Sequence, residues 1–415
     1  MSEIHTPEAG SSVPAMSIVG RTILPSASAA PPAAAASPTT VAGRLSGSQR
    51  LLKDLMPPDF SISLAAYVRG GTDRMLLHPP TERRQPMRGF ESTYVDIVDY
   101  IVRITHRIWE EKDVGYIYDT YRHNARVVDD SGLQYGRDKV VADTVQALSA
   151  FPDMRVYADE VIWAGDENTG FYTSHRCRIQ GTNTGWSGFG APTNRRSATW
   201  CIANCVSQDN EIFEEWLMYD HVSQIRQLGF DVIALAKQCA DRRIRVPLPQ
   251  GQSEPTRLQG QGKPRRLPTP APDFDMADEV SRAHHYAWNW RNMTALDRLY
   301  DERLRFHGPS DRELNGLSAY KTWILGLIAM FPDLAMQLDE MYWMGNPKDG
   351  YLTALRWSAV GSHRGAGPYG PATGRQVRLW GLTQQRFLNG RIVEEWTLFN
   401  EFDVLQQILA SDPLS

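Results

Sequence analysis

The chain has 415 residues, of which 42% are hydrophobic, with 12 tryptophans and 16 tyrosines. This composition supplies enough apolar material for more than one folded core and excludes a wholly disordered chain. The formal net charge of −4, from 44 basic and 48 acidic residues, argues against a nucleic-acid-binding protein. Four cysteines, none in a Cys-x-x-Cys pair, are too few for a disulfide scaffold and lack the spacing of a zinc site. No apolar run reaches the length of a membrane span, so we expect no membrane association and a cytoplasmic location.

Low-complexity segments divide the chain into domains. The first 45 residues are rich in Ala, Pro and Ser, and they lack the positive start and unbroken apolar stretch of a secretory signal. We expect this tail to be disordered. A second segment, within 239–276, is rich in Pro and Arg. It fits either a basic phosphate-binding run or a solvated interdomain linker, and we favour the linker. The expected layout is a tail at 1–45, an arm or linker at 46–91, a first domain at 92–238, the Pro/Arg-rich linker at 239–276 and a second domain at 277–411.

An internal duplication relates the two domains. Phe151-Pro152-Asp153 recurs as Phe331-Pro332-Asp333, and we call the difference in numbering between these two motifs the repeat offset. The repeat offset holds without a gap as far as position 220, and 20 of those 70 positions are identical in the two copies. The run includes Glu214-Glu215-Trp216, which recurs as Glu394-Glu395-Trp396. The chain therefore contains two copies of one fold.

The elements of the first copy follow from its hydrophobic periodicity. Apolar residues at 100, 101, 104 and 108 predict a helix, and runs of aromatic and β-branched residues separated by glycines predict strands. A short helix is also expected over 51–56, ahead of the first copy. The expected order is a helix around 100–109, a short strand at 125–128, a helix at 138–151, strands at 154–163, 170–180, 197–208 and 211–219, and a last helix at 222–237. Helices followed by a run of strands predict an α+β domain with an antiparallel sheet.

Five short motifs in this order resemble the SnoaL-like polyketide cyclases, which belong to the nuclear-transport-factor-2-like superfamily. In the first copy they are Phe151–Asp153, Gly181-Thr-x-x-Gly185, Pro192-Thr-x-Arg195, Ile212-x-Glu-Glu-Trp-x-x-x-Asp220 and Gln227-Leu-Gly229. Most of them recur in the second copy, so the resemblance covers about 92–235 and 277–411. It implies tandem cone-shaped α+β barrels, each a curved antiparallel sheet wrapped around helices and enclosing an apolar cavity.

The resemblance implies cofactor-free chemistry, in which a desolvated carboxylate or histidine in the cavity shuttles a proton. The acid–base Asp of the family corresponds to Leu217 in the first copy and Thr397 in the second, which argues against the aldol cyclisation itself. We therefore predict His175 and Asp220 as the catalytic pair of the first domain. The alternatives are a hydrogen-bonded structural role for His175 and an N-cap for the helix that follows Asp220.

A further set of residues is expected to line the pockets. Glu214 and Glu215 must point to opposite faces of their strand, and either could face the cavity. Ion pairing with Arg176 or Arg195 is the alternative for these glutamates, and we favour it. The predicted substrate-binding residues are Tyr172, Tyr219, Glu215, Trp109, Trp186 and Asn183. The predicted second-domain pocket residues are His363, Asn400 and Glu395.

Two functions remain open at this stage. The first is a cofactor-independent acid–base enzyme, of the isomerase, lyase, dehydratase or cyclase type, that acts on a small hydrophobic oxygenated ring compound in the first domain. The second is a non-catalytic module for small-molecule binding or assembly. The expected partner is a small hydrophobic molecule, without nucleic acid or metal. Because domains of this class often pair through their sheets, we expect the two copies to form an intrachain pseudo-dimer and leave a homodimer open.

Overall fold

The computed structural model describes residues 50–67, 72–242, 264, 266–270 and 273–410. The predicted tail at 1–45 and most of the predicted linker at 239–276 lie outside these residues, so both remain predictions. The described residues all belong to one compact unit. None of the described helices is both long and apolar enough to cross a membrane.

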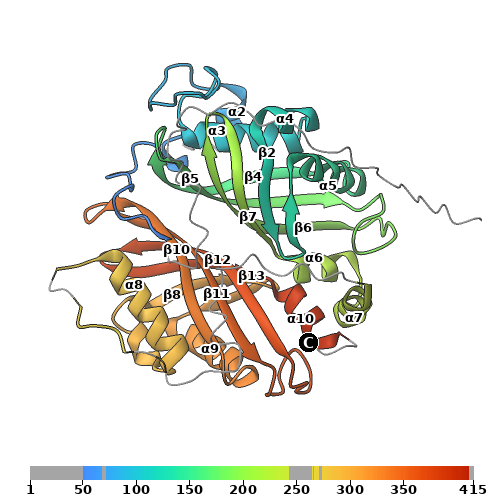
Figure 1. Ribbon diagram of the computed structural model, residues 1–415, viewed down its shortest axis with the longest axis vertical. Helices are drawn as coiled ribbons and strands as arrows, with labels where there is room; N and C mark the ends of the chain where they lie inside the picture. The colour runs from blue at the N-terminus through green and yellow to red at the C-terminus, as the bar shows by residue number, and fades with distance from the viewer. Residues whose placement is uncertain (1–49, 68–71, 243–263, 265, 271–272, 411–415) are drawn as a thin grey trace, which may run out of the picture. The chain divides into compact units, whose positions relative to one another are not determined.

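The first copy is a six-stranded sheet packed against helices (Figure 1). The strand order is β3-β2-β7-β6-β5-β4, in which only β2 and β7 run parallel. Three short elements, β1 (Arg50–Leu51), α1 (Leu64–Tyr67) and α2 (Thr72–Leu77), precede it. Its own elements are α3 (Ile97–Trp109), α4 (Ile117–Thr120), β2 (Tyr121–Asp129), β3 (Gly132–Tyr135), α5 (Arg137–Ala150), β4 (Arg155–Asp166), β5 (Gly170–Thr182), β6 (Arg196–Gln208), β7 (Glu211–Tyr219), α6 (His221–Leu228) and α7 (Val232–Arg242).

The second copy repeats this arrangement with one added strand. Its strand order is β1-β10-β11-β12-β13-β8-β9, in which β1 joins the edge of the sheet in parallel with β10. Its elements are α8 (Met276–His284), a π-helical turn at His285–Asn289, a 3-10 turn at Met293–Leu296, β8 (Tyr300–Gly308), β9 (Arg312–Asn315), α9 (Leu317–Met330), β10 (Ala335–Asn346), β11 (Gly350–Ser362), β12 (Gln376–Leu388), β13 (Arg391–Phe399) and α10 (Glu401–Leu409).

The predicted α+β class is confirmed, and the four long strands of each copy lie where the aromatic and β-branched runs place them. The two sheets are curved, but each strand order has two edges that do not pair with each other. The expected barrels are therefore open curved sheets around helices and not closed barrels. The helix expected at 51–56 is wrong, since Arg50 and Leu51 pair with the second sheet. The helix expected at 222–237 is two helices, because Gly229 adopts a left-handed conformation with φ of 89° and ends α6.

Helix α3 lies in the core of the first copy for a reason that its sequence shows. Asp96 caps it by accepting a hydrogen bond from the backbone N–H of Asp99 at 2.9 Å. Ile97, Ile101 and Ile104 recur at helical spacing and are buried. This apolar face covers the sheet and forms one wall of the cavity described below.

The two sheets contact each other through residues at equivalent positions. The guanidinium of Arg176 lies 3.8 Å from the ring centroid of Trp396, and that of Arg356 lies 4.2 Å from the ring centroid of Trp216. These two pairs are related by the repeat offset of the sequence. Arg176 also donates to the Gln384 side chain at 2.8 Å. The duplication thus makes a symmetric contact inside one chain, while a homodimer stays a prediction.

Candidate active site in the first domain

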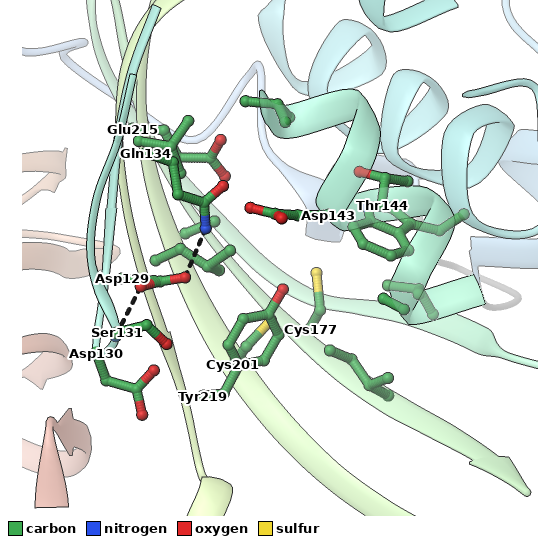
Figure 2. Close-up of a pocket in the computed structure, with 18 of the residues that line it drawn as sticks. Asp129, Asp130, Ser131, Gln134, Asp143, Thr144, Cys177, Cys201, Glu215 and Tyr219 are labelled. Atoms are coloured by element: carbon green, nitrogen blue, oxygen red, sulfur yellow. Dashed lines mark hydrogen bonds between the residues drawn. The ribbon is translucent and has the colours of Figure 1, made fainter. Parts of the chain in front are cut away.

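A cavity of about 640 Å³ lies inside the first domain, lined mainly by residues from α3, α5 and the sheet. Alternate residues of a strand face the same side, so β5 presents His175, Cys177 and Ile179 to the cavity. Strand β7 presents Glu215, Leu217 and Tyr219 in the same way. Figure 2 shows the side chains of Glu215, Asp129, Asp143 and Tyr219 directed into this space.

The structure decides which glutamate of the recurring pair faces inward. Glu215 lines the cavity, whereas Glu214 points to the opposite face of the sheet and accepts a hydrogen bond from Arg50 at 2.7 Å. The favoured pairing of these glutamates with Arg176 or Arg195 is therefore wrong. Period-two alternation could place the two residues on opposite faces, but it could not say which face was concave.

Glu215 is a buried carboxyl group that accepts a hydrogen bond from a tyrosine hydroxyl. The Tyr121 hydroxyl donates to its Oε2 at 2.8 Å, and the residue is 7% exposed. Burial raises the pKa of Glu215 to about 7, and the nearby charge of Asp129 also raises it, while the hydrogen bond from Tyr121 opposes the rise. Both protonation states are thus accessible near neutral pH, as general acid–base catalysis requires.

A second polar group of the cavity lies at the end of β2. The Oδ1 of Asp129 accepts from the backbone N–H groups of Ser131 and Gly132 at 2.7 and 3.0 Å, which fixes the β2–β3 turn. Its Oδ2 accepts from the side chain of Gln134 at 2.6 Å. Burial and the charge of Asp130 raise the pKa of Asp129 to about 6.

Tyr219 and His221 form the aromatic part of this end of the cavity. Their rings stack with centroids 5.1 Å apart, and His221 Nδ1 lies 2.6 Å from Asp130 Oδ2. Burial alone would lower the pKa of His221, but the charge and hydrogen bond of Asp130 outweigh it and raise that pKa. Burial keeps the pKa of Tyr219 well above its usual value, so its hydroxyl is a neutral hydrogen-bond donor at pH 7.

The structure does not bring the predicted catalytic pair together. His175 lines the cavity, where its Nε2 lies 3.2 Å from Cys177 Sγ. Burial, with a contribution from Arg176, lowers the pKa of His175 to about 4, so the imidazole is neutral at pH 7. Asp220 is absent from the described residues that line the cavity.

Asp220 has the structural role that was its alternative. Its side chain caps α6 through the N–H of Ser223 at 3.2 Å. It also accepts from the N–H groups of Ser310 and Asp311, in the β8–β9 turn of the second domain, at 2.8 and 3.1 Å. The predicted pairing of Asp220 with His175 is therefore wrong, because these three amides hold the carboxylate outside the cavity.

The predicted substrate-binding residues divide into two groups. Trp109, Tyr219 and Glu215 line the cavity. Tyr172 is on the other face of the sheet, where its ring centroid lies 6.2 Å from that of Tyr342 in the second domain. Trp186 is 72% exposed at the surface. Asn183 is fully buried in a loop, where its side chain donates to the carbonyl of Gly185 at 2.8 Å and accepts from the N–H of Thr193 at 3.0 Å.

The predicted pocket residues of the second domain are all engaged by protein groups. Glu395 accepts from the hydroxyls of Tyr300 and Tyr320 at 2.7 and 2.8 Å. Asn400 accepts from the N–H of Trp380 at 2.9 Å, and His363 Nδ1 lies 3.2 Å from Thr373 Oγ1. These residues stabilise turns and core contacts, and the prediction that they form a ligand pocket has no support in this geometry.

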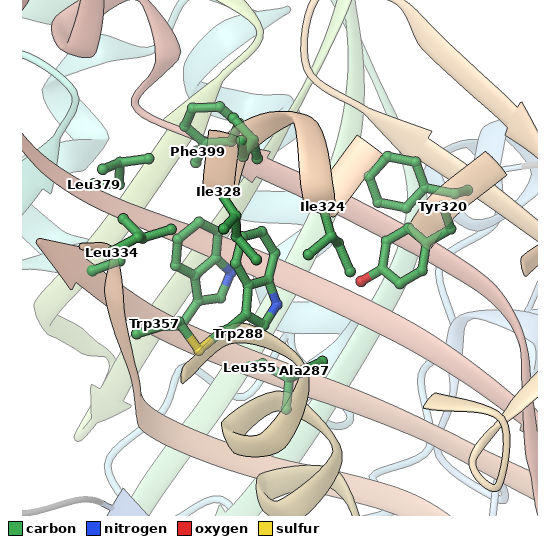
Figure 3. Packing of buried hydrophobic residues seen from close by; sticks show 14 of the residues in the cluster. Ala287, Trp288, Tyr320, Ile324, Ile328, Leu334, Leu355, Trp357, Leu379 and Phe399 are labelled. Atoms are coloured by element: carbon green, nitrogen blue, oxygen red, sulfur yellow. The ribbon is translucent and has the colours of Figure 1, made fainter. Parts of the chain in front are cut away.

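Larger side chains fill the interior of the second domain where the first domain has its cavity. By the repeat offset, Trp357 corresponds to Cys177, Tyr320 to Val140, and Trp323 to Asp143. Figure 3 shows Trp357 packed among Trp288, Ile328 and Phe399. Two copies of one fold thus differ in the space available for a ligand, because small cavity-facing residues of the first copy are replaced by aromatic ones in the second.

The predicted site residues do not include Tyr121, Asp129 and His221, which line the cavity. Comparison of the two copies could have found two of them. Asp129 ends β2 where Gly308 ends β8, and His221 is replaced by Glu401. Within the described residues, no group of three His, Cys, Asp or Glu side chains is arranged to hold a metal ion.

The cavity and the curved sheet around helices define a cone-like fold. The sequence profile of the family described as SnoaL-like polyketide cyclase matches residues 100–228 and again 278–408, which together are more than half of the chain. The chain belongs to this family and carries two tandem copies of its domain. A comparison of the chain with curated proteins found no match.

Solved structures show a more distant likeness, to one copy at a time. IdmH from Streptomyces antibioticus, a candidate polyketide cyclase, is 23% identical over 32% of this chain and 96% of its own, with a TM-score of 0.28. AclR from Streptomyces galilaeus, a candidate hydroxylase, is 20% identical over 34% and 91%, with a TM-score of 0.28. A protein of ketosteroid isomerase-like fold from Catenulispora acidiphila is 18% identical over 32% and 93%, with a TM-score of 0.27.

Proposed function

We propose that the first domain binds a small hydrophobic, oxygenated ring compound in its cavity and acts on it by cofactor-independent proton transfer. Glu215 is the acid–base group. The observation that carries this proposal is its buried carboxyl, which faces a cavity of about 640 Å³ and has a pKa of about 7. A group whose pKa lies near the working pH is populated in both protonation states, so it can accept a proton and donate it again.

The chemistry that this arrangement supports is proton abstraction next to a carbonyl group. The Glu215 carboxylate accepts a proton from the carbon, and the electron pair of the broken C–H bond forms the enolate. The Tyr219 hydroxyl, which is neutral at pH 7, is suited to donate a hydrogen bond to the enolate oxygen. Return of the proton from Glu215 to another carbon gives isomerisation. Transfer of that proton to a β-hydroxyl, which leaves as water while the enolate electrons form the C=C bond, gives dehydration. Attack on a second carbonyl gives cyclisation.

We place the proton transfer at Glu215 because Leu217 cannot transfer a proton. Leu217 occupies the position that corresponds to the acid–base Asp of the family, and it has no ionisable group. Glu215 lies two residues earlier on the same strand and faces the same cavity. The carboxylate is thus displaced along the strand by about 7 Å, which changes the part of a ligand that it reaches.

The competing function is ligand binding without chemistry, and one screen separates the two. Wild type, Glu215→Gln and Cys177→Trp are compared by thermal shift against ring ketones, lactones, phenylpropanoids and steroids. A ligand present at a hundredfold its Kd raises the free energy of unfolding by about 2.7 kcal/mol. We expect a compound that stabilises wild type and Glu215→Gln, is consumed by wild type alone, and stabilises Cys177→Trp less because the indole takes up part of the cavity.

Consumption of that compound by Glu215→Gln at the wild-type rate would contradict the proposed role of Glu215. Binding without consumption by wild type would establish the non-catalytic function instead. The cytoplasmic location and a homodimer remain separate predictions, which this screen does not address.

A further inference from the structure

The cavity of the first domain is acidic to a degree that the proposed proton transfer does not require. Four carboxyl groups are among the described residues that line it, and none of those described residues is a lysine or an arginine. The four belong to Asp129, Asp130, Asp143 and Glu215. An apolar enclosure strengthens the repulsion among such groups, because the local dielectric constant is low.

Two of these carboxyl groups have a cationic protein partner and two do not. Asp130 is bound to His221, and Asp143 forms an ion pair with Lys139. Asp129 is bound only by neutral donors, namely two turn amides and Gln134. Glu215 has the neutral hydroxyl of Tyr121. Asp129 and Glu215 therefore have no ion-pair partner among the described residues, although the charge of His221 also acts on Asp129 and lowers its pKa.

The second domain has different groups at the equivalent positions. Glu395 replaces Glu215 there and is surrounded by the donors of Tyr300, Tyr320 and Gln385. The position of Asp129 is taken by Gly308. The second copy thus folds without an acid at the position of Asp129 and with its equivalent of Glu215 fully hydrogen-bonded. The fold itself therefore does not require the acidic lining of the first copy.

An independent feature offers a further polar contact to a ligand. Gln406 of α10, which belongs to the second domain, lines the same cavity and is 9% exposed. Its side-chain amide has no hydrogen-bond partner among the residues that the structure describes. The nitrogen and oxygen of this amide are not among the fully buried atoms that lack a partner, so water or a polar atom of a ligand can reach them. The second domain thus adds one polar group to a site that is otherwise built by the first.

We infer that the ligand of this cavity carries a protonated amine, which pairs with Asp129 and leaves Glu215 to transfer the proton. The inference rests on the proposed function of the cavity as a ligand site. The ammonium group supplies the missing counter-charge, and the apolar walls of α3 contact the ring of the ligand. Asp129 is a binding residue in this arrangement, and Gln406 satisfies a polar atom of the ligand.

Three probes of the same shape test this inference by calorimetry on the full chain at pH 8. They are 2-aminoindane, 2-indanol and indane-2-carboxylate, which share one ring system and carry a cationic, a neutral and an anionic group at the same position. We expect 2-aminoindane to bind wild type at least tenfold more tightly than 2-indanol, and the carboxylate to bind least. Asp129→Asn retains the acceptor for the turn amides but loses the charge, so it should abolish the preference. Glu111→Gln, which removes a surface carboxylate, should retain it.

Equal or tighter binding of 2-indanol or of the carboxylate would overturn the inference, as would a preference for the amine that survives in Asp129→Asn. Failure of all three probes to bind would overturn it as well. The proposed function is judged separately by the consumption of ring compounds in wild type and Glu215→Gln. A neutral ligand that is consumed by wild type alone would leave proton transfer standing and remove the amine.

Discussion

The raised pKa of Glu215 predicts how the stability of the protein depends on pH. The folded protein holds the proton of Glu215 up to about pH 7, whereas the unfolded chain releases it near pH 4.5. Between these values the native state binds more protons, so the free energy of unfolding falls as the pH rises. From pH 5 to pH 8 the contribution of this one group to stability decreases by about 2.5 kcal/mol.

Glu215→Gln isolates that contribution because it removes the titrating group and keeps the shape. We expect the difference in free energy of unfolding, wild type minus variant, to decrease by about 2.5 kcal/mol from pH 5 to pH 8. Urea unfolding followed by tryptophan fluorescence measures both proteins at both pH values. His175 has a lowered pKa and acts in the opposite sense, but it is present in both proteins and cancels in the difference. Glu111→Gln controls for the change in net charge. A difference that does not vary with pH would refute the assignment of Glu215 as a desolvated acid.

Further predictions concern the surroundings of the site. Cys177→Trp should leave the protein folded and weaken ligand binding, measured by thermal shift, because the indole takes up part of the cavity. A variant that binds with wild-type affinity would show that the ligand lies elsewhere. Trp357→Ala should destabilise the second domain by about 3–5 kcal/mol in urea unfolding, since it empties a packed interior, and a loss below about 1 kcal/mol would contradict that packing. Asp220→Ala should cost about 2–4 kcal/mol because three amides lose their acceptor, while ligand affinity stays within twofold; a selective loss of turnover would restore Asp220 to the site. The imidazole proton resonances of His175 should not titrate between pH 5.5 and 8, and a midpoint inside that range in the NMR spectrum would show that the ring is less desolvated than we describe.

The sequence repeat predicts more of the fold than of the site. The constant repeat offset and the aromatic strand runs locate the long strands of both copies, because period-two burial is a local property of the chain. The break between α6 and α7 at Gly229 escapes this reasoning, since apolar residues continue across it. The pairing of Arg50 with the second sheet also escapes it, because the partner strand β10 belongs to the other copy and is distant in the sequence.

The site is harder to predict because it depends on the direction in which each strand faces. Glu215 and Glu214 are equivalent by pattern, and only the packing of the two sheets places Glu214 against Arg50. Asp220 follows β7 directly and resembles a cavity acid, but the turn at Ser310 and Asp311 from the other copy holds it. His175 faces the cavity as predicted, but the desolvation that lowers its pKa depends on neighbours that are distant in sequence.

The most direct test of the central claim is deuterium exchange into a ring ketone. Wild type and Glu215→Gln are incubated in D2O with 2-indanone, and loss of the proton signal at the carbon next to the carbonyl is followed by NMR. If Glu215 abstracts protons in the first-domain cavity, wild type should accelerate exchange well above the buffer rate, and Glu215→Gln should return it to that rate. Equal exchange with the two proteins would contradict the proposed role of Glu215 and favour a cavity that binds its ligand without chemistry.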